Sequence, residues 1–500
     1  MTKIAQQVSL AGIELRRRSA VPLLNQLAEA LRTSILQGQL RPGGRLPSTR
    51  LLATEFGVSR NTVMNAYAQL LNEGYLEARV GSGTCVARSL PNEVPPIVVA
   101  TPHMSSRPGT ARRNVLSLSG RHLARAPTRV LSGPGVARPF ASGQPDVSLF
   151  PFKLWARLLA RRWRRPERGL TEHGDAAGYR PLREAIAAYL RTARAVRCEA
   201  DQVLVVNGSQ QALDLSARIL LRPGDKAVIE EPGYPGARTA FAAAGAALSP
   251  LPVDEDGADI RGYRGSNRRP RLIFVTPSHQ YPLGVTMTVA RRLALLDWAR
   301  RSGAWILEDD YDSEFRYRAR PLPSMQGLDG TGQVIYMGSF SKTLFASLRL
   351  GFLVLPPSLV EPFQRARAVV DGHSPITEQV ALAEFIEDGH FGRHIRRMRA
   401  LYEERQTVLL EAAQRNLDGL LDVRPADGGM HLLGWLPKGV ADFSASRRAA
   451  DFDVVVKSLS LCSMRPRKMS RGGLLLGYAA LTPEQIRDGA ERLAKALARG

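Results

Sequence analysis

Cysteine and long apolar runs are both scarce in this sequence. The three cysteines, Cys85, Cys198 and Cys462, lie far apart and have no metal-ligand spacing. The first residues lack the apolar core of a signal peptide, and no apolar run approaches the roughly 18 residues of a membrane helix. Dispersed thiols without a secretory signal are typical of a reducing compartment. We therefore expect a cytoplasmic protein with no membrane segment and no metal site.

Acidic residues are outnumbered by basic ones. The chain has 46 Asp and Glu residues against 69 Lys and Arg residues, which gives a formal net charge of +23. Such a surplus favours polyanions, because each phosphate contact releases condensed counterions. An arginine-rich background composition would produce the same surplus. The charge alone therefore suggests nucleic acid as a partner but does not establish it.

The order of patterns along the chain predicts its organisation. The 500 residues exceed what one hydrophobic core usually organises. Residues 89–138 are rich in proline and arginine and carry no periodic apolar face, which predicts a linker between domains at 1–88 and 139–500. In the last segment, helical patterns alternate with short apolar runs, as in an α/β fold with a mainly parallel sheet covered on both faces. The predicted helices are residues 182–191 and 209–221, and the predicted strands are 203–206, 227–230, 272–276, 305–307 and 334–337.

Residues 22–86 have the pattern of a helix-turn-helix followed by a small hairpin. Ala53, Gly57 and Val63 supply a small residue where two helices cross, a glycine for the turn and a valine that packs the second helix. Ser59 is a suitable N-cap for that second helix. Its outward residues suit base edges and phosphates in the major groove, and they are Arg60, Asn61, Met64 and Asn65. A degenerate module with two buried helices would show the same short spacing.

The run GGRLPSTRLLATEFGVSRNTVMNAYAQLLNEGYLEARVGSG resembles the GntR family of winged helix-turn-helix regulators. The resemblance implies that residues 1–88 bind double-stranded operator DNA. Many family members have an arginine where this chain has Met64, so one base contact is not carried over. The DNA contacts that the resemblance implies are Arg50, Ser59, Arg60, Asn61 and Thr62, with Gly81 at the wing tip and Arg45 as a phosphate contact.

The run SFSKTLFASLRLGF, residues 339–352, surrounds one lysine with groups that suit a phosphate. Ser339 and Ser341 flank Lys342, and the Arg349 guanidinium follows. A phosphate-bearing aldehyde would need such a cradle beside an amine that forms a Schiff base. Without these neighbours, a lone lysine would more simply be a solvated charge.

Three other stretches fit the same ligand. The acidic run 308–312 follows a predicted strand, so Asp309 or Asp310 could keep a pyridine nitrogen protonated while the Tyr311 hydroxyl reaches a ring oxygen. Gly208-Ser209-Gln210 opens a predicted helix whose backbone N–H groups can bind phosphate. Tyr234 could stack on the pyridine ring. An acidic run alone would more often be a solvated loop or a metal site.

Together these segments resemble the fold-type-I pyridoxal-phosphate enzymes of the aminotransferase class over residues 139–500. With the phrases FASGQPDVSLFP, GSQQALDL, PGYPGAR, TPSHQYPLG, EDDYDSEFRY and GGMHLLGW, the whole chain resembles the MocR subfamily of GntR regulators. The resemblance implies pyridoxal 5′-phosphate as cofactor, a smaller C-terminal subdomain, a homodimer, and an amine or amino-acid effector. It implies these cofactor contacts: Lys342 as the Schiff base, Asp309 rather than Asp310 at the pyridine nitrogen, Tyr311 at the ring oxygen, Tyr234 over the ring, Ser209, Gln210, Ser339, Ser341 and Arg349 at the phosphate, and Tyr281 and His279 beside them.

Two departures from the aminotransferase pattern bear on turnover. Tyr281 replaces the asparagine of Asn-Pro-x-Gly, and Leu475 stands where these enzymes carry the arginine for the substrate α-carboxylate. A missing guanidinium clamp removes a charge-assisted contact of about 1.5–3 kcal/mol. An alignment slip by one position would make Leu475 an ordinary buried strand residue. The side chains that could substitute for the clamp are Arg471, Arg465, Arg238 and His279.

Three functions are compatible with these patterns. The first is a regulator, not an enzyme, whose cofactor lobe senses an amine or the cofactor itself. The second is a bifunctional protein with genuine aminotransferase turnover. The third is a repressor whose lobe only dimerises. The missing clamp favours the first function.

The recognition helix generates a prediction about two arginines. Arg60 lies outward in its first turn, so Arg60→Ala should cost about 1–3 kcal/mol on the operator and relax preference at one base pair. Arg45 precedes the helix-turn-helix, so Arg45→Ala should weaken all DNA alike and reduce the salt slope by about one. Salt-dependent binding to operator and scrambled DNA measures both effects. Equal loss on both DNAs for Arg60→Ala would move the base contact to Asn61 or Asn65.

Overall fold

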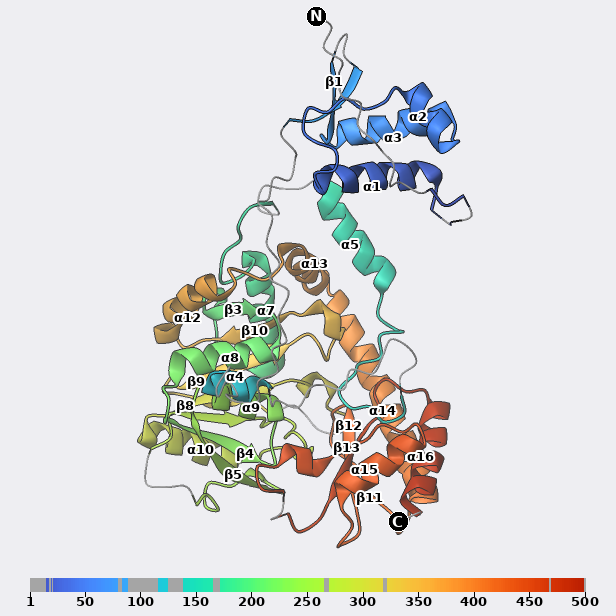
Figure 1. Cartoon of the computed structure of the whole chain (residues 1–500). Coiled ribbons are helices and arrows are strands. Elements are labelled where there is room, and N and C mark those ends of the chain that lie inside the picture. The colour runs from blue at the N-terminus through green and yellow to red at the C-terminus, as the bar shows by residue number, and fades with distance from the viewer. Residues whose placement is uncertain are drawn as a thin grey trace, which may run out of the picture. The chain divides into compact units, whose positions relative to one another are not determined.

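The computed structural model divides into two units, Met1–Ala111 and Arg112–Gly500, which are described separately here (Figure 1). The structure describes residues 15–17, 19, 21–79, 83–88, 116–124, 138–164, 171–264, 269–317, 322–466 and 469–498. Within these ranges, no helix is both long and apolar enough to cross a membrane.

The first unit is a three-helix cluster with a two-stranded wing. Its elements are α1 Leu23–Leu36, α2 Thr49–Phe56, α3 Arg60–Asn72, β1 Leu76–Arg79 and β2 Gly83–Val86, with β1 and β2 antiparallel. Gly57 ends α2 with a φ of 61°, and the Ser59 side chain caps α3 by accepting from the Thr62 amide. One face of α3 is buried against α1 and α2 through Val63, Ala66, Tyr67 and Leu70. The predicted helix-turn-helix is confirmed.

The second unit contains a mainly parallel sheet. Its strands are β3 Val203–Val206, β4 Lys226–Glu231, β5 Ala247–Asp254, β6 Gly257–Ala258, β7 Leu272–Val275, β8 Trp305–Asp310, β9 Val334–Ser339 and β10 Gly351–Val354. The order is β3-β10-β9-β8-β7-β4-β5-β6. β10 runs antiparallel to both neighbours and β6 antiparallel to β5, whereas the other pairs are parallel. The predicted strands and sheet class are therefore confirmed.

Alternating side chains bury the two faces of this sheet. In β3, Leu204 and Val206 join the apolar cluster of α8 and α9, whereas Val203 and Val205 join that of α7 and α13. This alternation follows from the two-residue period of a strand, so an apolar run such as VLVV fits only a sheet covered on both sides. The covering helices are α5 Phe152–Arg164, α7 Arg180–Arg194, α8 Ser209–Leu220, α9 Pro235–Ala243, α10 Val289–Ser302, α11 Met325–Leu328, α12 Pro357–Val370 and α13 Ile376–Glu387.

A smaller subdomain follows the long helix α14, His390–Asn416 (Figure 1). Its sheet is antiparallel, in the order β11-β12-β14-β13, with strands β11 Asp422–Val423, β12 His431–Trp435, β13 Lys457–Ser458 and β14 Gly473–Gly477. α15 Asp442–Asp451 and α16 Pro483–Ala498 pack on it. The smaller C-terminal subdomain is confirmed.

Two details differ from the predicted elements. β8 continues through Asp310, so the acidic run begins inside the strand rather than after it; Glu308 and Asp310 have buried hydrogen-bond partners, which lets the ladder continue. The predicted linker contains a helix, α4 Leu118–Ala124, which packs on α9 although none of its side chains is buried. The Ser119 hydroxyl donates to the Ala243 carbonyl in this contact.

Candidate cofactor and nucleic-acid sites

Lys342 lies just beyond the carboxyl end of β9, where the parallel strands of the sheet also end. Its Nζ donates to the Gly143 carbonyl over 2.5 Å. Gly143 has a φ of 82°, and a Cβ there would lie 2.6 Å from that Nζ. A side chain at position 143 would therefore displace the Lys342 amine from this position.

Backbone register brings the residues that are predicted to bind phosphate to one edge of the large sheet. Gly351 in β10 pairs with Val206 of β3 on one side and with Ser339 of β9 on the other. The helix start at Ser209 and Gln210 follows β3, and Arg349 precedes β10. Arg349 donates to the Asn207 carbonyl over 2.6 Å, and a Cβ on Gly208 would lie 3.3 Å from its guanidinium. Ser341 donates its amide to the Ser339 hydroxyl over 3.2 Å.

The two adjacent aspartates of β8 have different surroundings. Asp310 accepts from the Arg194 Nε at 2.8 Å and from the Tyr336 hydroxyl at 2.5 Å. Burial acts to raise the pKa of Asp310, but Arg194 and Tyr336 hold it below its usual value. Asp309 Oδ1 is buried and has no hydrogen-bond partner in the described part of the chain. Burial first, then Asp310 and Asp312, raises the pKa of Asp309 to about 8.

This contrast tests whether the residues fit a pyridoxal phosphate. A buried carboxylate needs a cation or a donor, because desolvation without one costs several kcal/mol. A protonated pyridine nitrogen is such a donor, and an amine and a phosphate cradle lie at the same sheet edge. These residues therefore fit pyridoxal phosphate, and Asp309 suits the pyridine nitrogen better than Asp310 does.

Tyrosine and histidine rings line the region beside Asp309. His279 Nδ1 lies 2.9 Å from the Tyr311 hydroxyl and 3.0 Å from Asp312 Oδ2. Tyr281 contacts Tyr311 edge-on at a centroid distance of 6.2 Å and Tyr234 at 5.7 Å. The four predicted ring contacts therefore form one connected cluster.

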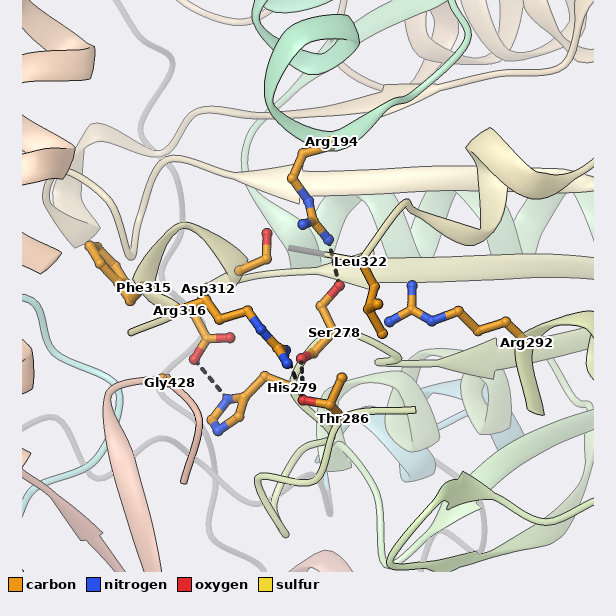
Figure 2. A pocket seen from close by; sticks show the side chains of 12 residues that line it. Arg194, Ser278, His279, Thr286, Arg292, Asp312, Phe315, Arg316, Leu322 and Gly428 are labelled. Atoms are coloured by element: carbon orange, nitrogen blue, oxygen red, sulfur yellow. Dashed lines mark hydrogen bonds and ion pairs between the residues drawn. The ribbon is translucent and has the colours of Figure 1, made fainter. Parts of the chain in front are cut away.

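A cavity of about 20 Å³ is lined by His279, Asp312 and their neighbours (Figure 2). Arg194 reaches it from one side and donates to the Ser278 hydroxyl over 2.6 Å, while Arg316 donates to Thr286 over 3.0 Å. This volume accommodates one ordered water, which needs two to four polar partners. On the residues that line this cavity, the buried polar atoms without a hydrogen-bond partner among the described residues are His279 Nε2, Asp312 Oδ1, Ser313 Oγ and Arg316 Nε. Such a water would tie His279, and through it Tyr311, to the arginines.

The structure places Leu475 in β14, fully buried against Leu433 and Leu459. Arg238 donates to the carbonyls of Leu461 and Ser463, and Arg471 to those of Leu436 and Trp435. Both guanidinium groups therefore have backbone partners in the structure. Of the predicted substitutes for the clamp, His279 lies in the ring cluster.

Sequence reasoning did not single out four residues of this region. They are Gly143, Arg194, His431 and Lys457. Gly143 and His431 had a local signal, inside the quoted phrases FASGQPDVSLFP and GGMHLLGW. The other two, Arg194 from a helix and Lys457 from the distant small subdomain, are brought to the site only by the fold.

On the first unit, most of the predicted DNA contacts that the structure describes are exposed side chains. Arg60 and Asn61 are exposed in the first turn of α3, and Arg50 is exposed on α2. The Ser59 hydroxyl lies 2.8 Å from that of Thr62, so both side chains also take part in the helix cap. Arg45 lies beside the wing, since a Cβ on Gly83 would be 3.4 Å from its guanidinium. Gly81 is outside the described residues.

The buried Asp309 generates a pH-dependent prediction for the cofactor-free protein. Its folded pKa of about 8 exceeds the usual value of about 3.9, so its contribution to stability is complete below pH 4 and is lost as pH rises through 8. Asp309→Asn removes this titration. We expect the melting temperature of the variant minus that of wild type, measured calorimetrically, to be larger at pH 9 than at pH 6. The other buried carboxyl groups are present in both proteins, so their contributions to the pH dependence cancel in this difference. An unchanged difference between the two pH values would contradict the assignment.

Family models match both units. Residues 23–86 match bacterial regulatory proteins of the gntR family, and residues 139–493 match aminotransferase class I and II. The second match overlaps the lobe that contains Lys342 and Asp309.

Individual proteins are similar over most of the chain. The probable rhizopine catabolism regulatory protein MocR of Rhizobium meliloti is 44% identical, covering 96% of this chain and 95% of its own. The pyridoxine biosynthesis transcriptional regulator PdxR of Corynebacterium glutamicum is 31% identical, covering 84% of each. Among solved structures, LysN, an alpha-aminoadipate aminotransferase of Thermus thermophilus complexed with N-(5′-phosphopyridoxyl)-L-leucine, is 31% identical with a TM-score of 0.67, covering 72% of this chain and 92% of LysN. This chain thus belongs to the aminotransferase class I and II family and, through its N-terminal unit, to the MocR subfamily of gntR regulators.

Proposed function

We propose that this transcription regulator binds operator DNA as a homodimer and uses pyridoxal phosphate at Lys342 to sense an amine or amino-acid effector. The observation that carries the proposal is that groups suited to the cofactor occur together, whereas the arginine that would hold the substrate α-carboxylate is missing. Asp309 has an unpaired buried oxygen, whereas Leu475 is packed in an apolar cluster. Such a site can hold a cofactor and react with an amine without the usual means of orienting an amino acid for turnover.

The residues would divide the binding of the cofactor among them. When bound, pyridoxal phosphate supplies an aldehyde that reacts with a primary amine. Lys342 would provide that amine, and Asp309 would keep a proton on the pyridine nitrogen. Tyr311, positioned by His279, would donate to the ring oxygen. Tyr234 would cover the ring, with Tyr281 packed against its edge. The phosphate would be held by Ser209, Gln210, Ser339, Ser341 and Arg349.

An alignment slip does not restore the clamp. β14 reads GLLLG, so no neighbouring position of the strand holds a cation. The alternative function, genuine aminotransferase turnover, is favoured by the likeness to LysN and requires another group to hold the substrate. Rapid amino transfer to an oxo acid would favour that alternative, and no spectral response to any amine would favour a lobe that only dimerises.

The predicted linker, residues 89–138, could provide a route for the signal. α4 packs on α9, and α9 begins directly after Tyr234. An effector that displaces Lys342 from a cofactor ring covered by Tyr234 would therefore act next to α9, the helix on which α4 packs. We propose that residues 89–138 transmit this change from the lobe at 139–500 to the DNA-binding unit at 1–88.

The attachment point is tested by reduction. We expect purified wild type to be yellow and to gain one phosphopyridoxyl group on borohydride treatment, measured by intact mass. Lys342→Ala should lose the adduct, and Lys438→Ala, at an exposed site, should keep it. Arg349→Ala should weaken cofactor affinity while retaining the adduct, because its guanidinium would serve the phosphate alone. A one-to-one adduct that persists in Lys342→Ala would refute the assignment.

A further inference from the structure

One face of the small sheet turns toward the ring cluster. Leu475 of β14 pairs directly with Leu433 of β12 and with Lys457 of β13. Directly opposed residues in antiparallel strands project to the same face. Leu433 and Leu475 share an apolar cluster with Tyr281 and Leu283, which identifies this face as the one beside the candidate cofactor site. A row of two leucines and one lysine therefore borders that site.

Lys457 reaches the aromatic cluster. Its Nζ donates to the Tyr281 hydroxyl over 2.9 Å and lies 5.3 Å from the centroid of that ring. Tyr281 in turn contacts Tyr234 and Tyr311. The lysine thus places a positive charge one strand away from the position where the clamp is missing.

Lys457 and Lys342 both act on the same buried residue, His431. It is 4% exposed, on β12, with its ring centroid 5.2 Å from that of His279 and 5.7 Å from that of Tyr281. Burial lowers the pKa of His431 to about 3, and His279 and the ammonium groups of Lys342 and Lys457 act in the same direction. Both lysines therefore lie within electrostatic reach of one buried imidazole.

The geometry points to Lys457 and Tyr281 as the site that recognises the effector, which is a primary amine carrying a distal oxygen acceptor and no α-carboxylate. This inference rests on the proposed amine sensing at Lys342. The effector amine would react at the Lys342 end, and its oxygen acceptor would bind the Lys457 ammonium beside Tyr281. Leu475 and Leu433 would pack against the carbon chain between the two groups.

The difference between a guanidinium and an ammonium explains why this site would select an effector without an α-carboxylate. A guanidinium binds a carboxylate through two parallel hydrogen bonds, which suits the α-carboxylate of an amino acid. An ammonium is a point charge that satisfies a single acceptor without fixing its plane. An α-carboxylate directed at Leu475 would enter an apolar cluster without a donor, and that desolvation is costly. The site therefore rejects α-carboxylates and accepts a more distant oxygen.

Three amines of matched chain length test this selection on the holoprotein. 2-Aminoadipate has both an α-carboxylate and a distal carboxylate, 5-aminopentanoate has only the distal one, and pentylamine has neither. Absorbance and calorimetric titrations give each dissociation constant. We expect 5-aminopentanoate to bind about 10- to 100-fold more tightly than pentylamine, the range for a hydrogen bond to a charged group. It should also bind more tightly than 2-aminoadipate.

Variants assign the difference to the lysine. Lys457→Met should bring 5-aminopentanoate to within about threefold of pentylamine, whose own affinity should not change; the threefold margin is about 0.65 kcal/mol. The matched control Lys438→Met, at an exposed site of the same subdomain, should leave all three constants unchanged. Leu475→Arg should shift preference toward 2-aminoadipate.

Two results would overturn the inference. One is a preference of wild type for 2-aminoadipate over 5-aminopentanoate, and the other is an equal loss of both 5-aminopentanoate and pentylamine in Lys457→Met. A wild type that responds to none of a wide panel of primary amines would instead refute amine sensing itself, and the inference with it.

Discussion

The Asp309 carboxylate imposes the strongest physical constraint on the second unit. It lies in a central strand of the sheet, away from water, and one of its oxygens has no partner among the described residues. The neighbouring Asp310 shows the usual solution, because a buried arginine and a tyrosine hydroxyl satisfy it. No hydrogen-bond donor among the described residues reaches Asp309 Oδ1, so the ionised form of Asp309 would be stabilised by a donor from outside the chain. In the proposed function, a protonated pyridine nitrogen would supply that donor, with the Lys342 amine and Arg349 at the same edge of the sheet.

Strand register converts separate sequence segments into a single cradle. Val206, Ser339 and Gly351 are direct neighbours across three strands, so the loops that follow or precede them meet at one edge. Close backbone approach makes this possible, since a Cβ on Gly351 would lie 3.1 Å from the Gly208 Cα. A slip of one residue would turn the strand side chains to the opposite face and separate these loops. The candidate cofactor site therefore depends on the same alternation that builds the two apolar cores.

Local pattern was sufficient for the elements and for their order, but not for all of the site. The apolar runs of β3 and β7 and the turn at Gly57 could be predicted because periodicity and turn chemistry are local. The contrast between Asp309 and Asp310 depends on Arg194, which lies more than a hundred residues earlier, and composition does not encode that contact. Lys457 had no motif and becomes significant only through its cross-strand pairing with Leu475. The helix α4 was missed because proline and arginine dominate the surrounding segment, whereas its packing on α9 is a tertiary effect.

In the proposed function, an effector amine that replaces Lys342 at the cofactor aldehyde changes the affinity of the protein for DNA. The most direct measurement is fluorescence anisotropy of a labelled operator fragment with full-length holoprotein, with and without an amine that saturates the absorbance change. Coupling free energies between two sites usually correspond to about 5- to 150-fold changes in affinity. We expect a change in this range for wild type and none for Lys342→Ala. Unchanged DNA affinity at saturating amine, or the same change in Lys342→Ala, would contradict the account.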